Sequence, residues 1–345
     1  DTNDLTSGLR RIADDMHGYY LITYVPQNTV YDGRFRQISV KLSQPNVEVQ
    51  ARRGYYAVES VGQFAVLDYE APALAAAQNA RANAGQSPLL SGALSFPAAN
   101  RPGLTLVLAE APLSTFTFAP AADKKTYQAD FSVVGLVRNQ SGQVVQKLSR
   151  HYPLSGPIEN LGAATKGELL FYRETQLPPG TYTLQLIAYD AATGKARSRT
   201  SPLEIPAADE SRPRLSSVMV IKRGERLTAE EQKRDQPFHY GELIVYPNLG
   251  EPVLKSASNQ LAFFFTAWPT KGSTAPLELT VEVMQGRRRL GHKSGQLPAA
   301  DTQGQIKYAS AIPLDKFEPG DYELKVSVSD GKASVSQSAG FTVAP

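Results

Sequence analysis

The stretch LPPGTYTLQLIAYD (Leu177–Asp190) has a close counterpart later in the chain, FEPGDYELKVSVSD (Phe317–Asp330). Each contains a Pro-Gly pair, one spacer residue, a tyrosine, a run of alternating apolar residues and a closing aspartate. Proline fixes φ and glycine permits positive φ, so each pair predicts a tight turn. The alternation predicts a strand with one buried face. The chain therefore carries the same turn-and-strand unit twice.

The tyrosines of these units, Tyr182 and Tyr322, each follow the turn glycine, Gly180 or Gly320, by the same offset. In Ig-like β-sandwiches a tyrosine near the start of the penultimate strand donates its hydroxyl to nearby backbone, an arrangement called the tyrosine corner. We predict that these four residues form two such corners and are structural. The sequence is thus predicted to be mainly β, with two tandem antiparallel Ig-like or fibronectin-III-like β-sandwiches.

The limits of the two sandwiches follow from where the period-2 pattern begins and stops. Short alternating runs between turn residues extend from about 89 to 206, and a second series extends from 214 to 345. The polar, proline-containing segment IPAADESRPR (Ile205–Arg214) separates them. We expect two separate folding units joined at this linker.

Two local signals add detail within the sandwiches. NQSG (Asn139–Gly142) predicts a hairpin turn in the first sandwich. In the second, Thr228 and Glu231 have the spacing of a capping box, which predicts a short helix.

The residues before the first sandwich have a different character. Leu5, Leu9, Ile12 and Met16 fall at helical spacing, and three strand-like runs follow, at 19–25, 34–42 and 47–56. One helix and three strands make a thin core, so this segment is expected to complete something larger. An alanine-rich stretch then predicts a helix, and we expect residues 61–88 to be a helical linker that packs lightly on a neighbour, the alternative being a helix that binds a partner.

The sequences DLTSGLRRIADDMHGYYLITYVP, DGRFRQISVKL and VEVQARRGYYA occur in this order over the first 60 residues. Their order and wording resemble the closing part of the von Willebrand factor A-like domain in the VWFA-related Acidobacterial domain family. The resemblance implies that residues 1–60 are the C-terminal part of a truncated α/β domain. It also implies an exported protein, periplasmic or secreted. The family's metal-ion-dependent adhesion motif, Asp-x-Ser-x-Ser, is absent here and would lie upstream, as would a signal peptide.

Composition limits the classes of function. The 36 Lys and Arg against 33 Asp and Glu give a net charge of +3, which supplies no broad footprint for nucleic acid. The chain has no cysteine, so disulfides, zinc-thiolate sites and cysteine nucleophiles are excluded. No apolar run is long enough to span a bilayer.

No catalytic or metal-binding constellation stands out. The four histidines lack metal-type spacing, and none of the GxSxG, P-loop or GxGxxG motifs occurs. Asp190 and Asp330 lack acidic companions, so we expect them to serve turns rather than calcium. We therefore predict no catalytic residues, no metal ligands and no cofactor.

One basic cluster is a candidate contact site. QGRRRLGHK gathers Arg287, Arg288, Arg289, His292 and Lys293 around an expected hairpin tip, where guanidinium groups could hold a sulfated or phosphorylated glycan. The same charges could instead form a solvated hairpin that protects strand edges from pairing. Exposed aromatics are a further possibility, and a flat carbohydrate or protein contact patch could include Tyr55 and Tyr56, Phe171 and Tyr172, and Tyr240 and Tyr246.

The modular order favours a non-enzymatic scaffold or adhesion-type protein that binds another protein at the cell envelope. The alternative is that the sandwiches are carbohydrate-binding accessory modules of a cell-envelope enzyme.

Overall fold

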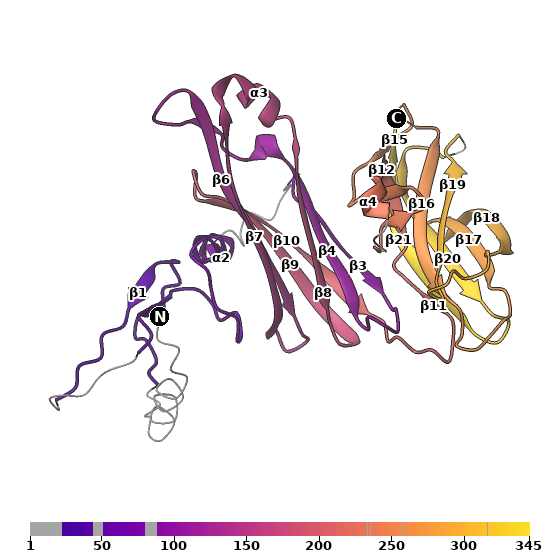
Figure 1. The fold of residues 1–345 in the computed structure, drawn as a ribbon, viewed down its shortest axis with the longest axis horizontal. Coiled ribbons are helices and arrows are strands. Elements are labelled where there is room, and N and C mark those ends of the chain that lie inside the picture. Colours follow the sequence, from indigo (N-terminus) through magenta and orange to yellow (C-terminus); the bar gives the residue numbers. More distant parts are fainter. Residues whose placement is uncertain are drawn as a thin grey trace. The chain divides into compact units, whose positions relative to one another are not determined.

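The computed structural model describes residues 23–43, 51–79, 88–232, 234, 236–256, 258–315 and 317–345. The chain divides by its internal contacts into two units, Asp1–Tyr31 and Asp32–Pro345. The described residues of the first unit, 23–31, form no helix or strand. The second unit is mainly β, as predicted (Figure 1). Among the described residues, no helix is both long enough and apolar enough to cross a membrane.

The described part of the first 60 residues contains little regular structure. β1 (Phe35–Gln37) and β2 (Gly54–Tyr56) form a two-stranded antiparallel sheet. Both strands are shorter than the runs at 34–42 and 47–56 suggested. The helix predicted from Leu5 to Met16, and most of the strand predicted at 19–25, lie outside the described residues.

The first module, residues 89–206, contains two antiparallel sheets. One has the order β3–β4–β8, and the other has the order β10–β9–β6–β7, with the short β5 also paired to β6. The elements are β3 (Leu90–Phe96), β4 (Leu104–Pro112), η2 (Leu113–Thr115), β5 (Ala119–Pro120), β6 (Thr126–Arg138), β7 (Val144–Pro157), η3 (Ile158–Asn160), α3 (Leu161–Ala164), β8 (Glu168–Gln176), β9 (Gly180–Asp190) and β10 (Lys195–Ile205).

The second module, residues 214–345, also contains two main sheets. One has the order β11–β16–β12–β14–β13, with β19 also paired to β16, and the other has the order β15–β21–β20–β17–β18. The elements are β11 (Arg214–Leu215), β12 (Met219–Arg226), α4 (Ala229–Gln232), β13 (His239–Tyr240), β14 (Leu243–Pro247), β15 (Val253–Leu254), β16 (Gln260–Trp268), β17 (Glu278–Gln285), β18 (Arg288–Gln296), β19 (Ile306–Pro313), β20 (Gly320–Ser329) and β21 (Ser334–Ala344).

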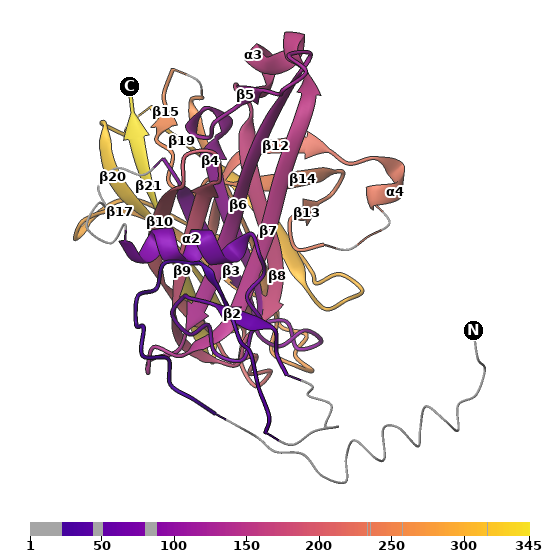
Figure 2. The ribbon, with the colours of Figure 1, turned by 90° about the vertical axis from the view of Figure 1, so that its left-hand side faces the viewer.

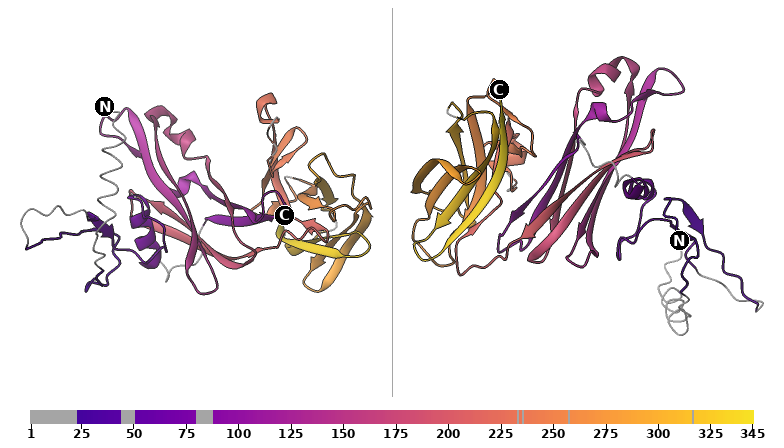
Figure 3. Two further views of the ribbon diagram at one scale, coloured as in Figure 1. Left: turned by 60° about the horizontal axis from the view of Figure 1, so that its bottom comes forward. Right: turned by 180° about the vertical axis from the view of Figure 1, so that it is seen from behind.

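The two modules share one strand order. In the first, β4 is flanked by β3 and β8, while the facing sheet runs β10–β9–β6–β7. In the second, β16 is flanked by β12 and β19, while the facing sheet runs β21–β20–β17–β18. The repeated sequences are therefore equivalent strands, β9 and β20, each central in its sheet. Two further views show the long hairpins of both modules (Figure 3).

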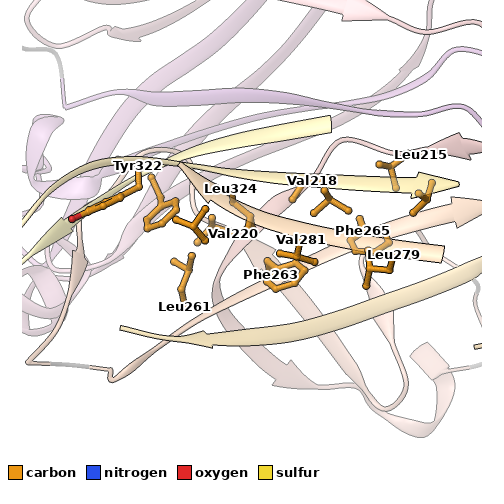
Figure 4. Packing of buried hydrophobic residues seen from close by; sticks show 14 of the residues in the cluster. Leu215, Val218, Val220, Leu261, Phe263, Phe265, Leu279, Val281, Tyr322 and Leu324 are labelled. Atoms are coloured by element: carbon orange, nitrogen blue, oxygen red, sulfur yellow. The ribbon is translucent and has the colours of Figure 1, made fainter. Parts of the chain in front are cut away.

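Each module has its own apolar core between its two sheets. The alternating residues of the repeated strands contribute to it directly: Leu184, Leu186 and Ala188 on β9, and Leu324, Val326 and Val328 on β20, are all at most 1% exposed. Figure 4 shows Leu324 and other buried side chains gathered in the core of the second module. Period-2 alternation in the sequence thus corresponds to one buried face in the structure.

The predicted local signals are also present. The hairpin between β6 and β7 turns at Asn139–Gly142, where Gly142 has a φ of 81° and the Asn139 side chain accepts the backbone N–H of Ser141. The capping box is formed as well: the Glu231 carboxylate accepts the Thr228 N–H at 2.8 Å, and the Thr228 hydroxyl accepts the Glu231 N–H at 3.3 Å. Helix α4 follows directly.

The predicted linker helix is present as α2 (Glu70–Asn79), but it packs more closely than expected. It lies against β6, β9 and β10 of the first module (Figure 2). Ala73, Leu74 and Ala77 are at most 5% exposed and contact apolar residues such as Leu136 and Ile187 on the sheet's outer face. The alanines matter because small side chains let the helix approach the sheet. α2 is therefore a part of the first module's packing.

A buried ion pair anchors α2 at its first turn. Glu70 is fully buried and pairs with Lys147 of β7, and the Ser149 hydroxyl also donates to it. Glu70 in addition accepts the backbone N–H of Leu67 at 2.8 Å. The carboxylate is thus surrounded by donors, as a buried charge requires.

The two modules share an apolar interface as well as the linker. Phe96, Leu104 and Leu106 from β3 and β4 belong to the same buried cluster as Phe264 and Trp268 from β16. The interface therefore buries the outer face of one sheet of each module. The segment Ile205–Arg214 separates the two cores, but each module covers part of the other module's apolar surface.

Polar contacts cross the same interface. Lys222 on β12 lies 3.1 Å from Glu110 and from Glu168 of the first module, and 2.9 Å from Glu251. Burial lowers the pKa of Lys222, but the hydrogen bonds to the three carboxylates outweigh this, and the net pKa is raised. Arg214 donates to the Pro97 carbonyl at 2.9 Å. The contacts of Lys222 with Glu110 and Glu168 and of Arg214 with Pro97 therefore join the two modules.

Candidate functional site

The predicted basic cluster lies on the β17–β18 hairpin, but the structure divides it between two faces. Arg287 and Arg288 are exposed at the tip. Arg289 points to the outer face of the sheet, where it contacts Glu282 at 3.0 Å and lowers the pKa of that carboxyl. Lys293 pairs in register with Val281, a core residue, and therefore stands on the inner side of β18. The cluster is a basic edge rather than a single pocket.

Arg287, Arg288 and Lys293 have no acidic partner within 4.0 Å among the described residues. Their charges are thus available to a ligand. Guanidinium groups form paired hydrogen bonds with carboxylates, phosphates and sulfates.

A groove of about 510 Å³ lies beside this edge, between β18 and β19. These strands are the edges of the two facing sheets of the second module, and in the described chain β18 pairs only with β17. The floor consists of core side chains, including Phe263, Leu279 and Val281, which Figure 4 labels. Leu290, Ile312 and Pro313 contribute further apolar surface. The groove thus opens onto the module's interior.

The groove exists because three inward positions on the strands that border it carry small residues. Gly291 and Gly295 pair in register with Val283 and Leu279, so both occupy inward positions on β18. A Cβ added at either glycine would meet no atom within 4 Å. Across the groove, Ser310 of β19 pairs with Phe263 of β16 and is likewise small. Side chains that would cover the core are missing at these three positions.

The equivalent position in the first module, between β7 and β8, is closed. Leu148, Tyr152 and Leu154 of β7 pack against that module's core. Three side-chain hydrogen bonds also connect the two strands: Gln146 to the Thr175 hydroxyl at 2.7 Å, the Tyr152 hydroxyl to the Leu170 carbonyl at 3.3 Å, and Arg173 to the Ser149 carbonyl at 3.1 Å. The shared strand order therefore does not require an open edge.

The repeated tyrosines occupy equivalent places and contact backbone. The Tyr182 hydroxyl donates to the Pro178 carbonyl at 2.9 Å, and the Tyr322 hydroxyl donates to the Glu318 carbonyl at 2.6 Å. In both cases the acceptor lies four residues upstream, across the Pro-Gly turn that contains Gly180 or Gly320. Each bond ties the turn to the start of the strand.

The repeated aspartates have a common role that the sequence did not reveal. Asp190 accepts the hydroxyl of Thr117 at 2.7 Å, and Asp330 accepts the hydroxyl of Thr270 at 2.6 Å. Thr117 lies between η2 and β5, in the segment that leads from β4 to β6. Thr270 lies in the loop between β16 and β17. The Thr270 bond and backbone N–H groups hold the pKa of Asp330 at about 2. Each carboxylate fastens one loop to the end of a central strand.

Other candidates from the sequence are not assembled into a site. Phe171 is fully buried, and Tyr172 and Tyr240 contact the interface cluster between the modules. Tyr246 lies under the Arg223 guanidinium, 4.5 Å from ring centroid to Cζ. Within the part of the chain that the structure describes, no three His, Asp or Glu side chains are grouped as metal ligands.

Sequence reasoning found the basic residues of the β17–β18 hairpin but missed the groove. A signal was present: once LELTVEV is paired with RLGHKSGQ, both glycines of the second strand fall opposite core residues. That inference needs the register of the hairpin, which the sequence did not supply.

Comparison with family models and with curated proteins found no match for this chain. Among solved structures, one likeness is to trypsin-activated alpha-2-macroglobulin from Escherichia coli, with 11% sequence identity and a TM-score of 0.25 over 74% of this chain. The chain spans 16% of the length of that protein. At this TM-score the likeness supports no argument about fold or function.

Proposed function

We propose that this chain is a non-enzymatic part of an exported scaffold or adhesion-type protein, which binds another protein at the cell envelope. The observation that carries the proposal is the groove between β18 and β19, open over core side chains and next to an unpaired strand edge. Exposed apolar grooves with a polar rim are typical of binding sites. Lys293 lines the groove, and Arg287 and Arg288 are exposed at the tip of the same hairpin, so basic residues contribute to the polar rim.

The finer architecture is part of the same proposal. We infer that both modules are Ig-like, because their strand order and the tyrosine-to-backbone bonds support this assignment. We also infer, from the sequence resemblance, that residues 1–60 are the end of a von Willebrand factor A-like domain. Periplasmic or secreted localisation depends on the same resemblance.

Carbohydrate binding is the second candidate, and one observation favours it. Arg287 and Arg288 are exposed at the hairpin tip without acidic partners among the described residues. Such a pair suits a sulfated or phosphorylated glycan. The apolar floor of the groove, in contrast, suits apolar side chains, and for this reason we place protein binding first.

The test is capture from a cell-envelope extract with the immobilised chain, followed by cross-linking and mass spectrometry, with a glycan array in parallel. Protein binding predicts a cross-linked partner that maps to the second module and no glycan signal. Glycan binding that depends on Arg287 and Arg288, with no captured protein, would replace this proposal by the carbohydrate-binding one.

A further inference from the structure

We propose that the groove between β18 and β19 binds an extended peptide segment of another protein. The segment adds as a strand to β18, directs alternate apolar side chains into the groove and places carboxylates beside Arg287 and Arg288. This inference rests on the proposed function and names the chemistry of the partner. Strand addition of this kind takes its affinity from main-chain hydrogen bonds and its specificity from pockets for alternate side chains.

The edge of β18 is suited to strand addition. It is nine residues long, Arg288–Gln296, and almost every residue is exposed. A strand of this length extends about 30 Å. Its second edge has no partner strand in the described chain, so backbone N–H and C=O groups along it face solvent.

The inner face of β18 supplies the pockets. Gly291 and Gly295 alternate with Lys293 on that face and leave open space above Val283 and Leu279. An incoming strand presents side chains with the same period of two. Apolar side chains from such a strand would therefore fill the space left open at Gly291 and Gly295.

The first module shows what a filled edge looks like. There Leu148 and Tyr152 of β7 occupy the inward positions and pack against the core. The second module has the same strand order but lacks these side chains. The partner thus supplies to the second module the apolar contacts that β7 supplies within the first.

Charge selects the kind of strand. Arg287 and Arg288 stand at the start of β18 and Lys293 near its middle, without acidic partners among the described residues. Asp315 is the one carboxylate among the groove's lining residues, and it comes from the loop after β19. The surface is therefore basic along the first half of β18, which favours a partner strand with Asp or Glu at that end.

Edge protection by itself does not account for the groove. An inward-facing lysine such as Lys293 is a known means of preventing edge-to-edge aggregation. Such protection requires a charged side chain on the edge strand, but it requires neither the two glycines nor an opening onto the core. Lys293 instead excludes purely apolar strands and admits one with a carboxylate opposite it.

The probes are two fluorescein-labelled nine-residue peptides in which valine alternates with threonine, with three glutamates at the N-terminal end of one and the C-terminal end of the other. Binding to the full chain is measured by fluorescence anisotropy. We expect saturable binding of one orientation, because strand direction fixes which end meets the arginines. N-methylation of the alternate peptide residues whose N–H groups would face β18 should abolish binding, because the peptide then loses its main-chain hydrogen-bond donors.

Gly295→Ile fills the groove, and Ser294→Ile is its matched control. Ser294 also borders the groove, but it pairs with Thr280 and its hydroxyl lies 3.3 Å from the Thr280 hydroxyl, so the same side chain is added on the outer face of the sheet, away from the core. We expect Gly295→Ile to weaken binding by at least about tenfold and Ser294→Ile to leave it unchanged. Gly295 does not adopt positive φ, so the substitution is sterically allowed, and thermal unfolding will verify that the variant is folded.

Equal binding by wild type and Gly295→Ile would overturn the inference, as would the absence of saturable binding of both peptides up to about 1 mM. Self-association that Gly295→Ile abolishes, detected by sedimentation velocity, would show instead that a second copy of this chain occupies the groove. If Gly295→Ile still captures the envelope partner that wild type captures, the proposed function stands and the groove is not its site.

Discussion

Replacement of Tyr322 by Phe removes one hydroxyl from the core of the second module. Tyr322 is 5% exposed, and its hydroxyl donates to the Glu318 carbonyl at 2.6 Å. Tyr182 makes the same contact in the first module at 2.9 Å, but in a more exposed setting. The two substitutions therefore remove equivalent hydrogen bonds, of which the one made by Tyr322 is the more buried.

The magnitude follows from that difference. A typical hydrogen bond contributes about 1 kcal/mol net, and a buried acceptor left without a donor costs about 1–3 kcal/mol. We expect Tyr322→Phe to destabilise the second module by about 2 kcal/mol. Tyr182→Phe should cost about 0.5–1 kcal/mol in the first module, because water can reach the freed carbonyl.

Urea unfolding provides the assay, with far-UV circular dichroism for the whole chain and the fluorescence of Trp268, the only tryptophan, for β16 of the second module and its interface with the first. The midpoint should fall without a change in slope, since the surface exposed on unfolding is unchanged. Tyr308→Phe is the control: Tyr308 borders the same core, and its hydroxyl has no hydrogen-bond partner among the described residues.

An unchanged midpoint for Tyr322→Phe, or a larger loss for Tyr182→Phe than for Tyr322→Phe, would refute the argument from burial. A Tyr322→Phe protein that keeps its stability but loses binding to a partner would identify the hydroxyl as a ligand contact.

Four further predictions concern other parts of the molecule. Glu70→Gln should destabilise the first module by about 3–5 kcal/mol in thermal unfolding, because it leaves Lys147 charged and buried; a further Lys147→Met change should recover most of the loss. Hydrogen bonds from the Thr270 hydroxyl and from backbone N–H groups lower the pKa of Asp330 to about 2, so the stabilisation from its charged form is present above about pH 4 and is lost as the pH falls toward 2; Asp330→Asn should flatten stability measured across this interval, and an unaltered acid profile would contradict the assignment. Proteinase K should cut first within the linker, for example at the exposed Ala207, yet the fragments should co-elute in size-exclusion chromatography because the interface cluster holds them; prompt separation would show that the interface is weak. Calorimetric titration with calcium, magnesium or manganese should show no saturable heat at micromolar concentrations, and a stoichiometric site would point instead to a calcium-dependent adhesin.

The repeated stretches allowed much of the fold to be predicted. Alternation over Thr181–Tyr189 and Tyr322–Val328 gave two central strands and their buried faces, because the side-chain period of a strand is independent of what it pairs with. The Pro-Gly turns and the capping box at Thr228 were equally readable, since they depend on neighbouring residues only.

From the sequence alone, the two repeated strands, their inward faces and the position of the basic hairpin could be predicted. Only the tertiary structure decided that α2 covers a sheet, that the two modules share an apolar interface and that the second module has an open edge. Each of these depends on contacts between residues far apart in the chain. Gly291 and Gly295 are ordinary glycines in the sequence, and they become a groove only when pairing with β17 sets them opposite Val283 and Leu279 and β19 faces them with Ser310. Register and sheet packing supply that information, and local propensity does not.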